Sequence, residues 1–290
     1  MRYAAVMRHG LLADPVRTWV GAGPTATRSA VASTALAKVL GAPEREARVL
    51  GASSVALYLH FDSAAGEPSV IAVLASGAVR LPLALVVAGP LPGVHSLGSA
   101  RVGDGGVTVG SLRVRATRWF DPRPRLDANY ESSRIDDAER LLANLPSDAS
   151  GVAGFPVNDI AAGLIRGDAQ PALLVIGRGP GLTPAGDDVV AGTLAAIALR
   201  GQLHREATEG ILAHAASATT SLSSSLLRCA AAGQVVPQAA RMLSALCGAA
   251  PLAPALDDLL AVGGTSGTAL AIGLVAGARA VVCAPLEAAL

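Results

Sequence analysis

The sequence GRGPGLTPAGDDVVAG, residues 177–192, contains five glycines and two prolines and runs into an apolar stretch. This pattern predicts a glycine loop followed by a helix from Pro184 to Arg200. Thr183 stands where the N-cap of that helix belongs, with Pro184 at the first helical position. Small residues such as Gly192 and Ala196 allow neighbouring helices to approach closely. The stretch therefore predicts a tightly packed helical region that begins at a glycine loop.

The loop has the composition of an anion site. Glycines before a helix leave backbone N–H groups free to point at an anion, and the helix dipole adds to the attraction. The candidate substrate-binding residues in this segment are Arg178, Gly179, Gly181 and Gly186. The loop matches neither the GxxxxGK[ST] pattern of a P-loop nor a GxGxxG turn after a long strand.

Asp187 and Asp188 argue against a plain phosphate cradle, because two carboxylates repel a phosphate. One interpretation is that they only support the helix N-terminus, where the dipole favours negative charge. The other is functional: a cation such as Mg²⁺ bridges them, or they accept hydrogen bonds from an amide or amine of a ligand. On the functional interpretation, Asp187, Asp188 and Thr183 are the candidate catalytic residues. The histidines lack metal-ligand spacing, so no metal ligand is assigned, and Mg²⁺ is the one cofactor left open.

Two later segments repeat the passage from a polar loop into a helix. They are TTSLSSSLLRCAAAG, residues 219–233, and VGGTSGTALAIGL, residues 262–274. Their candidate substrate-binding residues are Thr220, Ser221, Ser224, Thr265, Ser266 and Gly267. Each hydroxyl taken alone is typical of a helix cap or a solvated loop. Three such helix starts together lead us to expect that the N-termini converge on a small polar ligand.

Composition indicates a globular protein with a large core. The chain has 290 residues, of which 51% are hydrophobic and 3% aromatic, with a mean hydropathy of +0.48. The net charge of +1 gives no indication of binding to nucleic acid or to another polyanionic partner. The Ala-rich faces and the large apolar fraction favour self-association over a lone monomer.

The sequence predicts a cytoplasmic protein without a membrane span. The longest apolar runs, Val189–Leu199 and Ala269–Ala278, fall well short of the roughly 20 residues that a span needs, and they predict buried core helices. The N-terminus, MRYAAVMRHG, lacks the apolar region of a signal peptide. Cys229, Cys247 and Cys283 lie far apart without a CxxC pair, which indicates reduced thiols.

The N-terminal half has the pattern of short strands. Apolar and polar residues alternate in GVTVGSLRVRATRW, residues 106–119, where Gly110-Ser111 predicts a slip or a bulge. Gly103–Gly106 predicts a turn. Together with similar runs from Ala47 onward, the pattern predicts an antiparallel sheet or small barrel. A helix over Ala26–Leu40, ending at Gly41, is expected before it.

The C-terminal half has a helical pattern. Residues 121–136 concentrate proline and charge and predict the crossing between the halves. The helices predicted beyond it are Asp136–Leu145, Asn158–Arg166, Pro184–Arg200, His204–Ala218, Ser223–Ala232, Gln238–Cys247 and Thr268–Val282. The sequence thus predicts an α+β protein, with a β-rich domain over residues 1–125 and an Ala/Gly-rich helical domain over residues 126–290.

The motif at residues 177–192 resembles the signature of a bacterial family long listed as uncharacterised, with a consensus close to G-x-GPGLTP-[SA]-GDD. One member of this family is AllH, the third subunit of the oxamate carbamoyltransferase of anaerobic allantoin degradation. The matching residues are Gly179, Pro180, Gly181, Thr183, Pro184, Gly186, Asp187 and Asp188, with Thr265, Ser266 and Gly267 in the later turn. Many relatives carry an acid shortly after that turn, where this sequence has Thr268 and Ala269.

The resemblance implies a subunit of an enzyme of purine and allantoin catabolism. Such an enzyme moves a carbamoyl group between carbamoyl phosphate and a small amide or amine acceptor such as oxamate, with the help of two other subunits. The amides of residues 177–181 would offer the phosphate site, and Asp187 or Asp188 would accept from the ligand's NH₂. The alternative is a non-catalytic ligand-binding or assembly subunit that holds a small anionic metabolite. Both interpretations predict a small-molecule ligand and partner subunits or a homo-oligomer, without nucleic acid or membrane.

Overall fold

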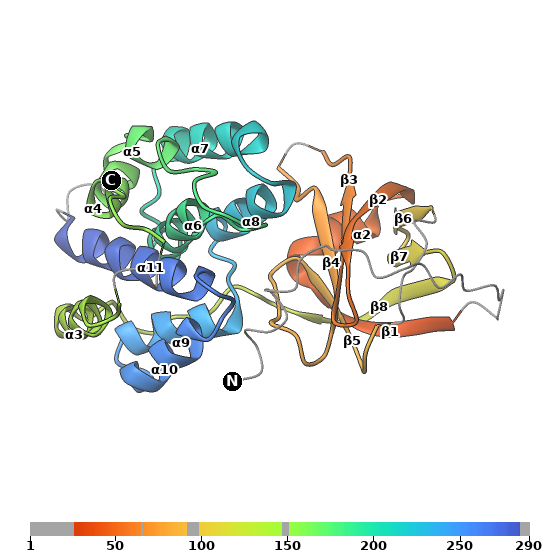
Figure 1. Cartoon of the computed structure of the whole chain (residues 1–290), viewed down its shortest axis with the longest axis horizontal. Helices are drawn as coiled ribbons and strands as arrows, with labels where there is room; N and C mark the ends of the chain where they lie inside the picture. The colour runs from red at the N-terminus through yellow and green to blue at the C-terminus, as the bar shows by residue number, and fades with distance from the viewer. Residues whose placement is uncertain (1–25, 65, 92–98, 147–150, 285–290) are drawn as a thin grey trace. The chain divides into compact units, whose positions relative to one another are not determined.

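The computed structural model describes residues 26–64, 66–91, 99–146 and 151–284. Contacts divide these residues between Pro122 and Arg123 into a unit of strands and a unit of helices (Figure 1). The expected α+β class is confirmed, with the strands first and the helices second. Residues 1–10, which carried the expectation about a signal peptide, lie outside the described ranges.

The N-terminal unit is a closed barrel in the described part of the chain. Its strands follow one another around the barrel in the order β1-β5-β4-β3-β2-β6-β7-β8. Their bounds are β1 Ala26–Ser33, β2 Arg45–Ala52, β3 Ala56–Phe61, β4 Val70–Ala75, β5 Ala84–Val87, β6 Ala100–Gly103, β7 Gly106–Val109 and β8 Leu112–Phe120. Alternation sets the faces, since Leu57, Leu59 and Phe61 of β3 are buried and the residues between them half-buried. Of the two predicted forms, sheet or small barrel, the barrel is confirmed.

The barrel is not wholly antiparallel, contrary to the expectation. The pairs β4–β5 and β1–β8 are parallel, and the other neighbours are antiparallel. The β1–β8 pair closes the barrel, and its register shifts between Ala30 and Val31. Closure leaves no open sheet edge, so the backbone donors and acceptors of these strands find partners within the barrel.

The helix predicted over Ala26–Leu40 is wrong for most of its length. Ala26–Ser33 is strand β1, and only a 3₁₀ turn at Thr34–Leu36 and helix α2, Ala37–Gly41, are helical. Pairing of β1 with both β5 and β8 outweighs the helix propensity of its alanines. The predicted end at Gly41 is confirmed.

Two glycine turns of this unit are two-residue hairpin turns. Asp104-Gly105 joins β6 to β7 with φ of 46° and 83°, as a type I′ turn requires, which confirms the turn predicted there. Gly110-Ser111 joins β7 to β8 as another two-residue turn, in which only Gly110 has a positive φ, of 53°. It is therefore a two-residue turn, and the bulge predicted at this position is wrong.

The described residues of the C-terminal unit form helices and loops, with no strand among them. Its helices are α3 Ser132–Ala143, α4 Val157–Arg166, α5 Gln170–Leu173, α6 Ala185–Ala198, α7 Arg205–Ala218, α8 Ser221–Ala231, α9 Pro237–Leu246, α10 Leu252–Leu260 and α11 Ser266–Cys283. The seven predicted helices are confirmed to within a few residues. The sequence pattern missed α5, which is short, and α10, whose first turn contains Pro254.

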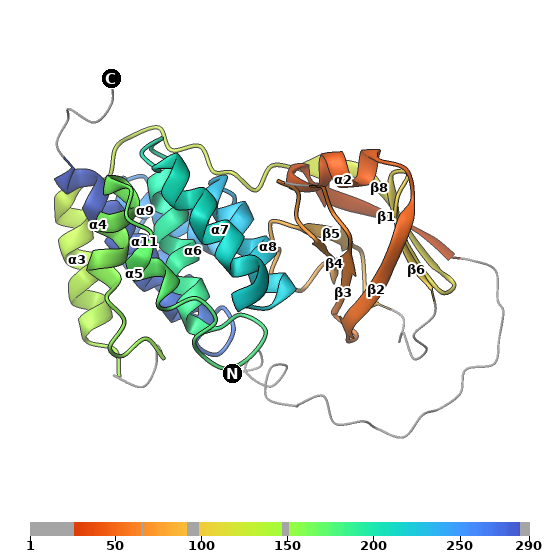
Figure 2. The same ribbon diagram turned by 90° about the horizontal axis from the view of Figure 1, so that it is seen from above.

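The crossing of α6 and α11 forms the core of the helical unit (Figure 2). A Cβ atom at Gly192 would lie 2.4 Å from the Leu270 carbonyl oxygen, and one at Gly273 would lie 2.1 Å from the Val189 carbonyl oxygen. Thr193 Oγ1 donates to the Gly273 carbonyl oxygen across the contact, at 3.2 Å. The two helices thus touch backbone to backbone, which only small residues allow.

Helix α11 is long and apolar enough to cross a membrane by length and composition alone, with a mean hydropathy of 1.6. More than half of it, 56%, is buried inside the structure, against α6, α4, α10 and other helices. Arg279 pairs with Asp136 and Glu139 and fixes it to α3. These contacts are those of a core helix, as the sequence predicted.

Candidate functional site

Hydrogen bonds bring the N-termini of α6, α8 and α11 together. Thr183 Oγ1, before α6, lies 3.0 Å from Ser266 Oγ at the start of α11. Thr220 Oγ1, before α8, donates to the Leu182 carbonyl oxygen at 2.6 Å. The glycine loop of residues 177–183 is thereby tied to both later helix starts.

Thr183 is not the N-cap of α6, contrary to the prediction. Pro184 holds that position with an extended ψ of 143°, and its carbonyl oxygen accepts from the amides of Asp187 and Asp188. The Thr183 side chain makes no capping bond and turns to Ser266 instead. Its hydroxyl therefore belongs to the group of polar side chains that joins the N-termini of α6, α8 and α11, which we call the cluster.

Asp187 is a buried carboxylate that binds three separate segments. It is 1% exposed, and its Oδ1 accepts from the Gly177 amide at 2.7 Å. Its Oδ2 accepts from the hydroxyls of Thr219 and Ser223, the latter at 2.6 Å. The side chain thus joins the glycine loop, the end of α7 and the first turn of α8, and its three protein donors fill most of its acceptor positions.

Asp188, the next residue, has the opposite surroundings. Its Oδ2 is buried and makes no hydrogen bond with the described residues. Its pKa is raised from 3.8 to about 8. Burial is the largest cause and raises the pKa, the hydrogen bond from the Ser266 hydroxyl lowers it, and the negative charge of Asp187 raises it. No cation of the described residues contributes to this shift. Asp188 is therefore a carboxyl that changes protonation near neutral pH, at the junction of α6 and α11.

The glycine loop offers fewer free amides than the sequence suggested. The Gly177 amide is bound to Asp187, and the Arg178 amide donates to the Val175 carbonyl oxygen at 3.0 Å. The amides of Gly179 and Gly181 make no hydrogen bond with the described residues. Gly181 has a φ of +95° and open space where a Cβ would stand. A small anion would therefore meet Gly179 and Gly181 rather than the whole loop.

Two other candidate glycines have a packing role in the structure. A Cβ at Gly186 would lie 1.9 Å from the Val175 carbonyl oxygen, and one at Gly267 would lie 2.0 Å from that of Leu259. Both positions admit no side chain, because the backbone of another segment occupies the space. Backbone packing is therefore enough to explain why glycine stands at both positions, without a ligand.

The remaining candidates differ in their partners. Thr220 caps α8, with its Oγ1 accepting from the Ser223 amide at 3.0 Å. Thr265 holds the N-cap position of α11 without a side-chain bond, and Arg178 is exposed without an ion pair among the described residues. Ser221 and Ser224 are half-buried in the first turn of α8.

Sequence reasoning did not single out Thr219 and Ser223, whose hydroxyls bind Asp187 in the structure. These two hydroxyls, not those of Ser221 and Ser224, hold Asp187. The signal was the hydroxyl run at 219–225, but which member points toward α6 depends on where α8 begins, and the prediction placed that start two residues late.

The surroundings of Asp187 argue against a Mg²⁺ bridged by the acidic pair. Asp187 is 1% exposed and already accepts three hydrogen bonds, so a shared cation would have only the second lone pair of its Oδ1 unless a protein donor were displaced. In the described ranges, no group of three His, Cys, Asp or Glu side chains is arranged to hold a metal ion.

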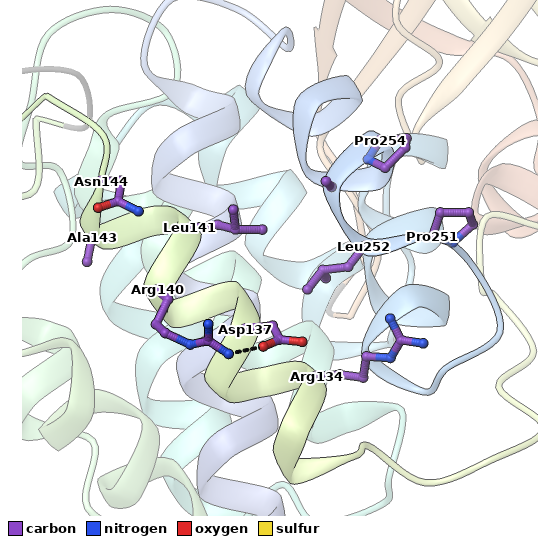
Figure 3. Close-up of a pocket in the computed structure, with 10 residues that line it drawn as sticks. Arg134, Asp137, Arg140, Leu141, Ala143, Asn144, Pro251, Leu252 and Pro254 are labelled. Carbon is purple, nitrogen blue, oxygen red and sulfur yellow. Dashed lines mark hydrogen bonds and ion pairs between the residues drawn. The ribbon is translucent and has the colours of Figure 1, made fainter.

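A separate hollow of about 750 Å³ lies between α3 and the start of α10 (Figure 3). Arg134, Asp137 and Arg140 line it from α3, and Pro251 and Leu252 line it from the other side. Asp137 is paired with Arg140 there. None of the candidate residues of the three helix starts lines this hollow.

The fold and this cluster define a class of protein: an α+β chain whose helical unit gathers a carboxyl, hydroxyls and free amides at converging helix N-termini. Residues 175–278 match the protein family described as oxamate carbamoyltransferase subunit AllH. The match confirms the family resemblance indicated by residues 177–192, and it covers the three helix starts. No curated protein and no solved structure gives a significant match.

Proposed function

We propose that this chain is a subunit of a carbamoyltransferase and that its ligand lies at the N-termini of α6, α8 and α11. The reaction transfers a carbamoyl group between carbamoyl phosphate and a small amide or amine acceptor such as oxamate. The family match supports a subunit of this class, and the observation that carries the site is the unpartnered, buried Oδ2 of Asp188.

The chemistry of the transfer needs one proton acceptor. The acceptor nitrogen attacks the carbamoyl carbon, the bond from that carbon to the phosphate oxygen breaks, and phosphate leaves. The nitrogen gives up one proton, which Asp188 takes as its carboxylate and returns in the reverse direction. A pKa of about 8 suits this role, because general acid–base catalysis is most efficient with a pKa near the working pH.

Other residues bind and orient the ligand in this proposal. The free amides of Gly179 and Gly181, with Arg178, receive the phosphate. The Ser266 hydroxyl, held by Thr183, donates to the Asp188 carboxyl and fixes its orientation toward the ligand. Asp187 does not touch the ligand and holds the loop in place.

Replacement of Asp188 by Asn tests the proposal, because the amide keeps the shape and cannot accept the proton. In the assembled enzyme we expect turnover to fall by about a hundredfold or more, the usual contribution of a general base. The melting temperature should still rise on addition of inorganic phosphate, which shows an intact binding site. Asp257→Asn, at an exposed position of α10, is the control and should keep full turnover.

The second candidate is a subunit that binds a small anionic metabolite without catalysing its reaction. The observation that favours it is the small number of ionisable side chains near the helix starts. Segments 174–188, 219–225 and 263–268 contain only Arg178, Asp187 and Asp188. Asp187 is occupied by its protein donors, which leaves two such groups to meet a ligand. In that case Asp188→Asn changes the ligand affinity and leaves the turnover of the assembled enzyme unchanged.

A further inference from the structure

The two most exposed large apolar side chains of the described structure lie in the loop next to the site. Leu174 is 59% exposed and Leu182 is 55% exposed. Single exposed leucines on a surface are common, but the two most exposed ones both occur in the loop beside a proposed ligand site, which calls for an explanation.

The backbone at both leucines is held in place. The Leu182 carbonyl oxygen accepts from Thr220 Oγ1 at 2.6 Å, and the next residue, Thr183, is bound to Ser266. The Leu174 amide donates to the Gln170 carbonyl oxygen at 3.2 Å. A surface with a fixed backbone and exposed apolar side chains loses little entropy on association, which favours tight binding.

The site is also short of positive charge for the proposed substrate. Carbamoyl phosphate is an anion, and Arg178 is the one cation in segments 174–188, 219–225 and 263–268. Asp187 adds negative charge to the same place, and Asp188 adds more whenever it is ionised. Enzymes that transfer groups from phosphates surround them with cations, so more positive charge must come from outside these segments.

We infer that Leu174 and Leu182 form the docking surface for another subunit of the enzyme, which covers the site and supplies a cation to it. The inference rests on the proposed function. The matching family is described as an enzyme subunit, so partner subunits are expected. The matched residues, 175–278, include Leu182 and begin directly after Leu174. An apolar rim around a polar site is the usual anatomy of such a contact.

The test uses Leu174→Asp and Leu182→Asp, singly and together, in the full chain. Its binding to the other oxamate carbamoyltransferase subunits, purified after co-expression, is measured by titration. Each single variant should bind roughly tenfold more weakly or worse, since a charge replaces a buried apolar contact. Leu141→Asp, at an exposed leucine on α3, is the matched control and should bind as the unchanged chain does. Melting temperatures of the isolated variants establish that all of them fold.

The charge contribution is measured with inorganic phosphate as the probe. Phosphate should bind at least about tenfold more tightly to the assembled enzyme than to the isolated chain. Three outcomes would each overturn the inference. Phosphate could bind equally tightly to the assembled enzyme and to the isolated chain, the leucine variants could bind the other subunits as the unchanged chain does, or Leu141→Asp could weaken that binding as much as they do. So would loss of self-association alone, which would make a second copy of this chain the occupant. Turnover of Asp188→Asn reports on the proposed function separately, because that variant keeps both leucines.

Discussion

At the scale of single residues, the two neighbouring acids of the motif have different roles. Asp187 points toward α8 and is satisfied by three donors, whereas Asp188 faces the junction with α11 and keeps one buried oxygen free. Adjacent residues on a helix point about 100° apart, so a pair read as one feature in the sequence meets two environments. Of the two, only Asp188 has a buried oxygen without a partner among the described residues, which is why the proposed function places the proton transfer there.

Asp188 should make the stability of the protein depend on pH. Its pKa is about 8 in the folded chain against 3.8 as the ordinary value, so the folded state holds a proton that the unfolded chain has released. The free energy of unfolding should therefore decrease as the pH rises from about 4 to about 8, by up to about 1.4 kcal/mol per pH unit. Urea unfolding at a series of pH values measures the slope. Asp188→Asn should flatten it, and an unchanged slope in that variant would contradict the assignment.

Asp187 should matter for stability. Asp187→Ala leaves the Gly177 amide and the hydroxyls of Thr219 and Ser223 without their acceptor, so the free energy of unfolding should fall by about 3 kcal/mol or more. Ser223→Ala removes one donor only and should cost about 1 kcal/mol. Chemical denaturation of the two variants checks this order, and a smaller loss for the Asp187 variant would show that the three bonds contribute little.

At the scale of secondary structure elements, the close crossing of α6 and α11 supports the whole site. The crossing fixes how the two helix starts meet, and hence the distance between Thr183 and Ser266. A change that separates the helices should therefore affect ligand binding even when it lies turns away from the motif.

Gly273→Ala should push these helices apart, because its Cβ would lie 2.1 Å from the Val189 carbonyl oxygen. We expect a loss of about 3 kcal/mol in the free energy of unfolding, or failure to fold. Gly210→Ala, in α7 with nothing within 4 Å, is the matched control and should gain about 0.5–1 kcal/mol. Thermal unfolding of both variants measures the difference, and similar melting temperatures would contradict the tight crossing.

The sequence predicted elements whose pattern is local and missed those decided by distant partners. Helices with clear apolar periodicity, such as α4 and α7, were placed to within a residue or so. The Ala-rich segment 26–33 looks helical by propensity, yet it pairs with β5 and β8 across the barrel. The site shows the same limit: the motif identified Asp187 and Asp188 together, and only the position of α8 and α11 separates their roles.

At the scale of the whole chain, the barrel and the helical unit each have a core of their own. The barrel buries residues such as Leu59 and Val114, and the helical unit buries residues such as Leu194 and Leu274. The family match at residues 175–278 lies entirely within the helical unit. The barrel therefore needs no contribution from the matched region to form its core.

Separate cores predict separate unfolding transitions. Trp119 lies in β8, and the Trp19→Phe variant leaves it as the only tryptophan of the chain. Its fluorescence should follow the barrel in urea, while far-ultraviolet circular dichroism should mainly follow the helices. We expect two curves with different midpoints. Superimposable curves would mean that the two units unfold as one.

The contact between Thr183 and Ser266 spans 83 residues, and it has a consequence for synthesis on the ribosome. At about 5–20 residues per second, the motif waits on the order of 4–17 s for its partner helix to be made. During that time Asp188 lacks the Ser266 hydroxyl that lies beside it in the folded chain. A chain stopped before Ser266 would carry the whole motif at residues 177–192 and would still lack the contact that joins the motif to α11.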